Sequence, residues 1–126
     1  MKTTELVLDF LKKQGFCPEV DPENGNIEFR YQMTTYIFIN NDEDEEFFQL
    51  VMPAIFDVTD DNREVVLEAA NKVNVGMKVQ KACVMHERVW LFFEIFLDHT
   101  PNVEDIIPRA LNALQAGRQR FYNEVG

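Results

Sequence analysis

The side chains most often used for catalysis or metal binding are few in this sequence and lie far apart. The histidines are His86 and His99, and the cysteines are Cys17 and Cys83. A metal site needs several converging ligands, and two histidines in separate predicted turns do not supply them. Cys83 and His86 are three residues apart at the end of a predicted strand, so their side chains point to opposite faces and form no local thiol–imidazole pair. We therefore predict no metal ion and no nucleophilic cysteine.

A run of acidic residues at positions 42–46 could indicate calcium binding. Asn40, Asp42 and Asp44 have the spacing of the first ligands in an EF-hand loop. Glu45 stands where that loop requires glycine, and no helices are expected on either side. Because consecutive acids repel one another, we predict a solvated turn between two strands. No glycine-rich phosphate-binding loop is present, and we predict that the chain is not an enzyme and holds no cofactor.

Glu94 is the most informative polar residue because it interrupts an otherwise apolar predicted strand. An ionised carboxylate on an aromatic strand face is costly unless a cation pairs with it. Lys81, on the preceding strand, is the expected partner. If the hairpin turns at Glu87-Arg88, residues 81 and 94 face each other. We predict a structural ion pair rather than a catalytic carboxylate.

Asn71 and Asn74 lie three residues apart on a predicted helix, beside its apolar stripe. Asparagine in such a place usually forms local hydrogen bonds, so we expect these residues to brace the helix end and the strand that follows. The alternative is contact with a ligand. In that case Asn71, Lys81 and Glu94 would converge in the pocket of a small-ligand sensor domain.

The elements that position these residues follow from apolar periodicity. Helices are predicted at about residues 4–14, with Thr3 or Thr4 as N-cap, and at 62–75 and 103–123. A short edge strand is predicted within 16–20, followed by strands that begin at Ile27, Tyr36 and Phe47, the last ending at Pro53. Residues 77–85 and 89–98 are predicted to form a hairpin. The prediction is a single α+β domain over residues 1–126, with an antiparallel sheet of five or six strands and three helices in the order α-β-β-β(-β)-α-β-β-α.

The charge balance restricts the partners that the chain can bind. With 12 basic and 22 acidic side chains the formal net charge is −10, and the cations are scattered along the sequence. Such a chain repels polyanions, so we predict no binding to nucleic acid or to membrane surfaces. The amino-terminal residues have neither the apolar stretch nor the cleavage site of a signal peptide, so we expect a cytoplasmic protein.

The last predicted strand is apolar on both faces. Val89, Leu91, Phe93, Ile95 and Leu97 alternate with Trp90, Phe92 and Phe96. Residues 36–39 and 47–52 are also apolar on both faces, which predicts central strands covered from two sides. Three helices can cover one face of such a sheet, so Trp90, Phe92 and Phe96 need another cover. We expect either a homodimer or the binding of a client protein on this face.

The order of elements resembles that of the YbjN family of bacterial domains. The residues that carry the likeness are Ile27-Glu28-Phe29-Arg30-Tyr31, Tyr36-Ile37-Phe38-Ile39, Phe47-Phe48-Gln49-Leu50-Val51-Met52-Pro53, Ala69-Ala70-Asn71-Lys72-Val73-Asn74 and Lys81. The resemblance implies a fold like that of type III secretion chaperones, which are dimers that hold segments of client proteins. Members of the family are described as proposed sensory-transduction regulators, without catalytic residues. The expected function is thus non-enzymatic protein binding, chaperone-like or regulatory, in a bacterial cytoplasm.

Overall fold

The structure, a computed structural model, describes residues 2–126 and has the predicted order of helices and strands. The elements are α1 (Thr3–Lys13), β1 (Glu19–Val20), β2 (Ile27–Tyr31), β3 (Thr34–Phe38), β4 (Phe47–Asp57), α2 (Arg63–Gly76), β5 (Gln80–Met85), β6 (Arg88–Phe96) and α3 (Val103–Val125). All neighbouring strands pair antiparallel in one six-stranded sheet, in the order β1-β2-β3-β4-β6-β5. The predicted α+β class is therefore confirmed.

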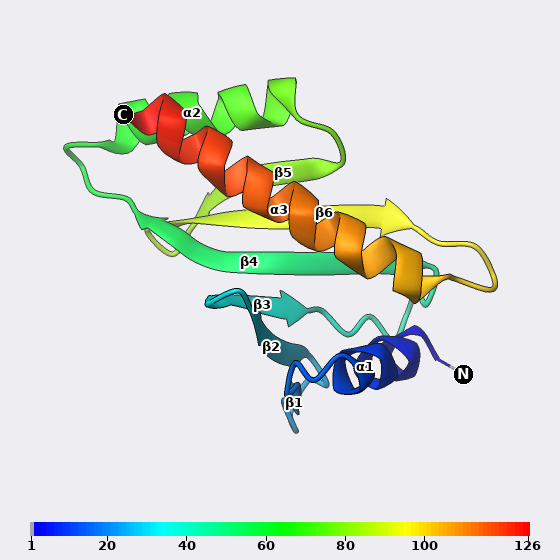
Figure 1. Cartoon of the computed structure of the whole chain (residues 1–126). Coiled ribbons are helices and arrows are strands. Elements are labelled where there is room, and N and C mark those ends of the chain that lie inside the picture. Colours follow the sequence, from blue (N-terminus) through cyan, green and yellow to red (C-terminus); the bar gives the residue numbers. More distant parts are fainter. Residues whose placement is uncertain (1) are drawn as a thin grey trace.

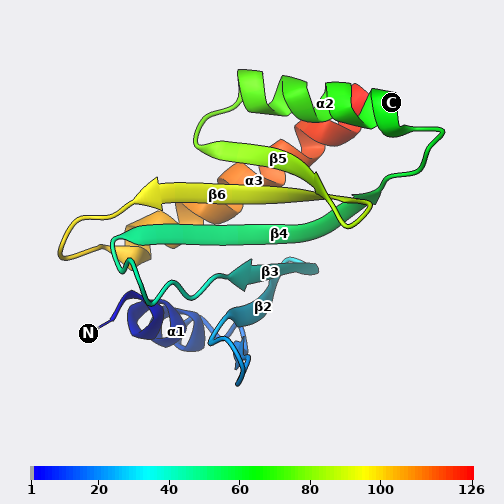
Figure 2. The ribbon, with the colours of Figure 1, turned by 180° about the vertical axis from the view of Figure 1, so that it is seen from behind.

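The helices lie to one side of the sheet or along its ends. In Figure 1, α3 runs diagonally across β6 and β4, with α2 near the β5 end of the sheet and α1 near the β2 and β3 end. Seen from behind, in Figure 2, the strands lie in front of α3. The sheet therefore has one face that α3 covers and one that it leaves bare.

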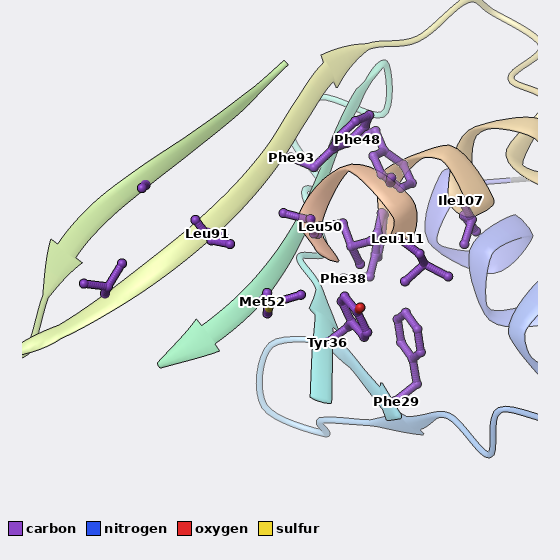
Figure 3. Packing of buried hydrophobic residues seen from close by; sticks show 14 of the residues in the cluster. Phe29, Tyr36, Phe38, Phe48, Leu50, Met52, Leu91, Phe93, Ile107 and Leu111 are labelled. Atoms are coloured by element: carbon purple, nitrogen blue, oxygen red, sulfur yellow. The ribbon is translucent and has the colours of Figure 1, made fainter. Parts of the chain in front are cut away.

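The core lies between α3 and the covered face of the sheet. The spacing of apolar residues along α3 follows the helical period, so they form one buried stripe. This stripe consists of Val103, Ile107, Ala110, Leu111, Leu114 and Phe121. It meets alternate residues of the central strands, including Phe48, Leu50 and Met52 of β4 and Val89, Leu91 and Phe93 of β6. Figure 3 shows this cluster, with Phe29, Tyr36 and Phe38 completing it on the β2 and β3 side.

The first helix begins as predicted, but its threonines do not act as N-caps. The Thr3 hydroxyl donates a hydrogen bond to the Glu45 carbonyl (2.5 Å), and the Thr4 hydroxyl donates one to Asn40 Oδ1 (2.7 Å). The two hydroxyls are thus used to attach α1 to the loop before β4. The helix is followed by Gly15 at a φ of 77°, the left-handed conformation that glycine commonly adopts after a helix.

The prediction that Pro53 ends its strand is wrong, because β4 continues to Asp57. The pairing of β4 with β6 is irregular between Met52 and Phe56, and Ala54 in this stretch has a φ of 49°. A proline is tolerated at such a bulge because the ladder lacks a hydrogen bond there anyway. Regular pairing then resumes with Phe56 opposite Val89.

The register predicted for the β5–β6 hairpin is also wrong, by two residues. The turn is formed by His86 and Glu87, at φ values of 53° and 59°, and not by Glu87-Arg88. Two left-handed residues are the requirement of a tight type I′ hairpin turn. Lys81 therefore pairs directly with Phe92 and not with Glu94. A two-residue shift leaves every side chain on its predicted face, because side chains alternate with a period of two.

The closest approach of α3 to β5 is at Gly117. The Gln80 side chain lies beneath the helix at this point and donates a hydrogen bond from Nε2 to the Ala113 carbonyl (2.8 Å). A Cβ atom on Gly117 would overlap Gln80 Oε1. The absence of a side chain at Gly117 is therefore what lets the two elements pack together.

Candidate interaction surface

The face of the sheet opposite α3 carries two groups of apolar side chains, which are separated by the paired polar residues Gln49 and Glu94. We call it the open face and define it by Ile37 of β3, Phe47 and Val51 of β4, and Trp90, Phe92 and Phe96 of β6. The pairing of strands brings these residues together, since Ile37 is opposite Val51, Val51 is opposite Phe92, and Phe47 is opposite Phe96. Figure 2 views the sheet from this side, where no helix crosses it.

Exposure is greatest at one end of the open face. The side chain of Phe96 is 81% exposed, and its ring centroid lies 5.8 Å from that of Phe47. Trp90 and Phe92 are half-buried, whereas Val51 is buried between its neighbours. The predicted division of β6 into two faces is therefore confirmed. The cover predicted on both sides of the central strands is present on one side only within residues 2–126.

Polar contacts hold the aromatic side chains of the open face in place. Trp90 Nε1 donates a hydrogen bond to the Met85 carbonyl (3.1 Å). The Lys81 ammonium lies 5.4 Å from the centre of the Phe92 ring, within the range of a cation–π contact. These contacts fix the positions of two aromatic rings, so the surface is preformed.

The predicted ion pair between Lys81 and Glu94 lies in the middle of the open face. Lys81 Nζ is 2.9 Å from Glu94 Oε1, and Gln49 Nε2 donates to Glu94 Oε2 at 2.6 Å. The pair joins the two strands diagonally, because Lys81 is opposite Phe92 in the ladder. The hydrogen bond with Glu94 raises the pKa of Lys81 above its ordinary value. In the folded chain the Glu94 carboxylate therefore has both a cation and an amide donor as partners.

The two asparagines of α2 differ in what they contact. Asn74 Nδ2 donates to the Ala82 carbonyl (3.1 Å), and the Ala82 amide donates to Asn74 Oδ1 (2.6 Å). The side-chain amide of Asn74 therefore pairs with the outer edge of β5 as a further strand would. Asn71, one turn earlier, is exposed, and no hydrogen bond of its side chain is found among residues 2–126.

The proposed ligand set of Asn71, Lys81 and Glu94 is not assembled. A hollow of about 280 Å³ does lie beside Lys81 and Glu94, but the helix residue that lines it is Asn74. The other lining residues are Met77, Val79, Gln80 and Phe92. Both charged side chains in this hollow already contact each other.

The remaining chemical candidates are separated in space. His86 lies in the β5–β6 turn, while His99 Nδ1 is 2.5 Å from Glu46 Oε2 in a different loop. Cys17 and Cys83 are both free thiols. In the described part of the chain, no three His, Cys, Asp or Glu side chains are placed to share a metal ion. None of the helices within residues 2–126 has the length and apolarity needed to cross a membrane.

Sequence reasoning did not identify Ile37, Phe47 and Val51 as members of the open face. All three belong to segments recognised as apolar on both faces. These residues lie beside Trp90, Phe92 and Phe96 because β4 pairs with β6. The two strands are not consecutive in the sequence, since α2 and β5 lie between them. A prediction that paired the two most apolar strands would have found them.

These features define an α+β domain with one helix-covered and one bare apolar sheet face. No protein-family model and no curated protein matches the sequence. Among solved structures, the chain is similar to an uncharacterised protein from Methanothermobacter thermautotrophicus, with a TM-score of 0.64 and 15% identity over 97% of this chain and 96% of the other. It is also similar to YbjN from E. coli, a proposed transcription regulator, with a TM-score of 0.67 and 7% identity over 97% and 87% of the two chains. At these identities the likeness shows a YbjN-like fold.

Proposed function

We propose that this chain is a non-enzymatic protein-binding domain that acts through the open face and forms a homodimer there. The observation that carries the proposal is the 81% exposure of Phe96, next to Phe47, on a sheet face that no helix covers. Large contiguous apolar surfaces on soluble proteins mark sites of interaction with other proteins. Aromatic residues are also the type most enriched where such interfaces are buried.

The energetics favour a second copy as the occupant. Burying one Phe or similar side chain contributes about 1.5–3 kcal/mol. A symmetric dimer would bury Phe47, Trp90, Phe92 and Phe96 twice, with part of their area already covered in the monomer. That contribution is comparable with the cost of association, roughly 4–15 kcal/mol. In a dimer with twofold symmetry the same surface of each copy forms the interface, and the open face can pair with itself in this way.

The charges on this side of the sheet are compatible with self-association. Lys81 is paired with Glu94, and Arg88 Nε lies 2.7 Å from Asp57 Oδ1. The net charge of −10 still disfavours contact between two copies, and five of the acidic side chains lie consecutively in the loop before β4. Because salt screens this long-range repulsion, we expect dimerisation to strengthen as ionic strength increases.

The test is sedimentation velocity over a range of protein concentrations. The wild type should change from monomer to dimer, and Phe96→Asp should remain a monomer because it places an unpaired charge inside the apolar contact. Met33→Asp is the matched control, since Met33 is 90% exposed but lies in the β2–β3 turn and outside the open face. It should dimerise as the wild type does. A wild type that stays monomeric at high concentration and high salt, or a dimer that survives Phe96→Asp, contradicts the proposal.

A client protein could bind to the same face as the second copy. We propose a chaperone-like or regulatory protein of the bacterial cytoplasm, in which a client protein takes the place of the second copy. We expect the client protein and the second copy of the chain to compete for the open face, because both would contact Phe96. Affinity capture with the wild type and with Phe96→Asp should recover the client with the wild type only.

The small-ligand alternative has weaker support. The hollow beside Lys81 and Glu94 has a volume of about 280 Å³, just below the range of about 300–1,000 Å³ typical of ligand pockets. Its two charged groups are 2.9 Å apart, so a ligand would have to break their ion pair. Mass spectrometry of the purified protein for a bound metabolite would distinguish this function from protein binding.

A further inference from the structure

A second apolar hollow lies on the covered side of the sheet, away from the open face. It is bounded by the first half of α3, the two residues just before β5 and the last residues of β6. Its volume is about 390 Å³, which lies within the range of about 300–1,000 Å³ occupied by small-molecule sites. We call it the α3 groove and define it by Lys78, Val79, Phe93, Ile95, Asp105, Ile106, Arg109 and Ala113.

The lining of the α3 groove is aliphatic and aromatic. Its apolar lining residues are Phe93 of the core cluster and Ile95, Ile106 and Ala113, which are partly buried against that cluster. Val79, at the rim, is 50% exposed. The strand β5 starts only at Gln80, so its neighbour β6 extends beyond it at this end. The groove is therefore built by the difference in length between two paired strands.

The backbone at the rim is held in an unusual conformation. Val79 has a φ of 65°, a region that β-branched residues rarely adopt. This conformation allows Gln80 to lie beneath α3, where it bonds to the Ala113 carbonyl. Strained residues of this kind are concentrated at functional sites. Val79 itself is one of the residues that line the groove.

The charges at the rim select the sign of a ligand. Lys78 and Arg109 are basic, and Asp105 Oδ1 lies 3.5 Å from Arg109 Nε. No carboxylate lies within 4.0 Å of the Lys78 ammonium among residues 2–126. The rim thus carries one net positive charge on a chain whose total is −10. An anionic group would be attracted to Lys78, whereas a cation would find only a carboxylate that Arg109 already contacts.

We propose that the α3 groove binds a medium-chain fatty acid, with the alkyl chain along Phe93, Ile95 and Ile106 and the carboxylate at Lys78. An apolar groove with a cation at its mouth matches a ligand that has an alkyl body and one terminal anion. This site is separate from the protein-binding face, and it does not depend on the function proposed for that face.

The test is calorimetric titration of the full chain with sodium decanoate below its micelle concentration. The wild type should bind one decanoate in a saturable manner, and 1-decanol should bind more weakly because it lacks the charge. Lys78→Gln should lower the affinity about three- to tenfold, and Asp105→Asn should raise it, since that change removes a repelling carboxylate and releases Arg109. Lys12→Gln, on α1, is the matched control and should have no effect.

Two further variants establish where the alkyl chain lies. Ala113→Phe should fill the groove and reduce affinity at least tenfold, and Ile106→Trp provides a second filling variant in case the first does not fold. Phe96→Ser removes the most exposed aromatic of the open face and should leave the affinity unchanged. Absence of saturable binding, equal binding of decanol, or normal affinity in a folded groove-filling variant would overturn the proposal. Loss of binding in Phe96→Ser would instead assign the alkyl chain to the open face and also overturn it.

Discussion

The two faces of β6 carry the same kinds of side chain in opposite environments. Leu91 and Phe93 point towards α3 and are buried, whereas Phe92 and Phe96 point away from it and are half-buried and exposed. All four belong to a run of six residues in one strand. Along β6, therefore, the position of α3 decides which apolar side chains are buried, and their hydrophobicity does not.

The faces also differ in where polar groups are placed. On the covered side, buried polar side chains such as Gln80, Thr34 and Tyr36 lie at the margins of the core. On the open face a charged pair, Lys81 and Glu94, lies in the centre of the apolar surface. A charged pair that becomes buried in an interface can fix the geometry of the contact more than it strengthens it. We infer that Lys81 and Glu94 define the register of whatever covers the open face.

The largest expected difference between the faces comes from truncating one phenylalanine on each. Phe48 and Phe96 are on neighbouring strands, and Phe48 is fully buried on the covered face. Phe48→Ala should lower the free energy of unfolding by about 3–5 kcal/mol, because it leaves a cavity in the core. Phe96→Ala should change the stability of the monomer by no more than about 0.5 kcal/mol. Urea denaturation at low protein concentration measures both values.

Repeating the urea denaturation of Phe48→Ala and Phe96→Ala at high protein concentration sharpens this comparison. The wild type should gain stability with concentration if two copies meet at the open face, and Phe96→Ala should gain less. Phe48→Ala should keep the same concentration dependence as the wild type. A loss of several kcal/mol in the Phe96→Ala monomer would mean that the open face belongs to the core.

The next largest effect is expected where α3 approaches the sheet. Gly117→Ala would place a methyl group against Gln80 Oε1, so we expect a loss of about 1–3 kcal/mol in thermal or urea unfolding. Gln80→Ala in the same chain should restore part of that loss by removing the obstruction. Gly76→Ala is the control, because its Cβ would meet only the flexible end of Arg120, at 3.4 Å. That variant should be neutral or slightly stabilising.

A smaller effect is expected at the sheet edge, where the two asparagines of α2 provide a matched pair. Asn74→Ala removes both hydrogen bonds to the Ala82 backbone and should cost about 1–2 kcal/mol. The Ala82 amide should also exchange with solvent faster, which hydrogen exchange detects directly. Asn71→Ala should have an effect within about 0.5 kcal/mol. Equal effects of the two variants would show that Asn74 does not brace the edge of β5.

Periodicity was enough to predict the helices and the two faces of β6. The stripe of Ile107, Leu111 and Leu114 predicts one buried side of α3, and the alternation along β6 predicts its two faces. The ion pair of Lys81 with Glu94 could be predicted because an isolated carboxylate among aromatic residues requires a partner. These inferences are local, so they do not depend on the arrangement of distant segments.

The failures concern geometry that periodicity does not encode. Shifting the pairing of the hairpin by two residues leaves each side chain on the same face of the sheet. The apolar pattern therefore could not distinguish a turn at His86-Glu87 from one at Glu87-Arg88. The sequence carries no glycine at this turn, and that absence hid its left-handed conformation. The continuation of β4 beyond Pro53 depends on a bulge opposite β6. The placement of Phe47 beside Phe96 depends on a crossover, which only the folded chain defines.

The smallest expected effect concerns the charged pair at the centre of the open face. The Lys81 side chain is 51% exposed, so Lys81→Gln should cost only about 0.2–1 kcal/mol at neutral pH. Because the hydrogen bond with Glu94 raises the pKa of Lys81 above its ordinary 10.5, folding favours the protonated amine. The contribution of the protonated Lys81 amine to the free energy of unfolding is fully present below pH 10.5. It is lost as the pH rises through the higher pKa that Lys81 has in the folded state. Urea unfolding of the wild type and Lys81→Gln should therefore differ at pH 8 and converge at strongly alkaline pH, where groups common to both chains cancel. A difference that is constant across this range would show that Lys81 stabilises the open face through its contact with Phe92 and its packing, without its charge.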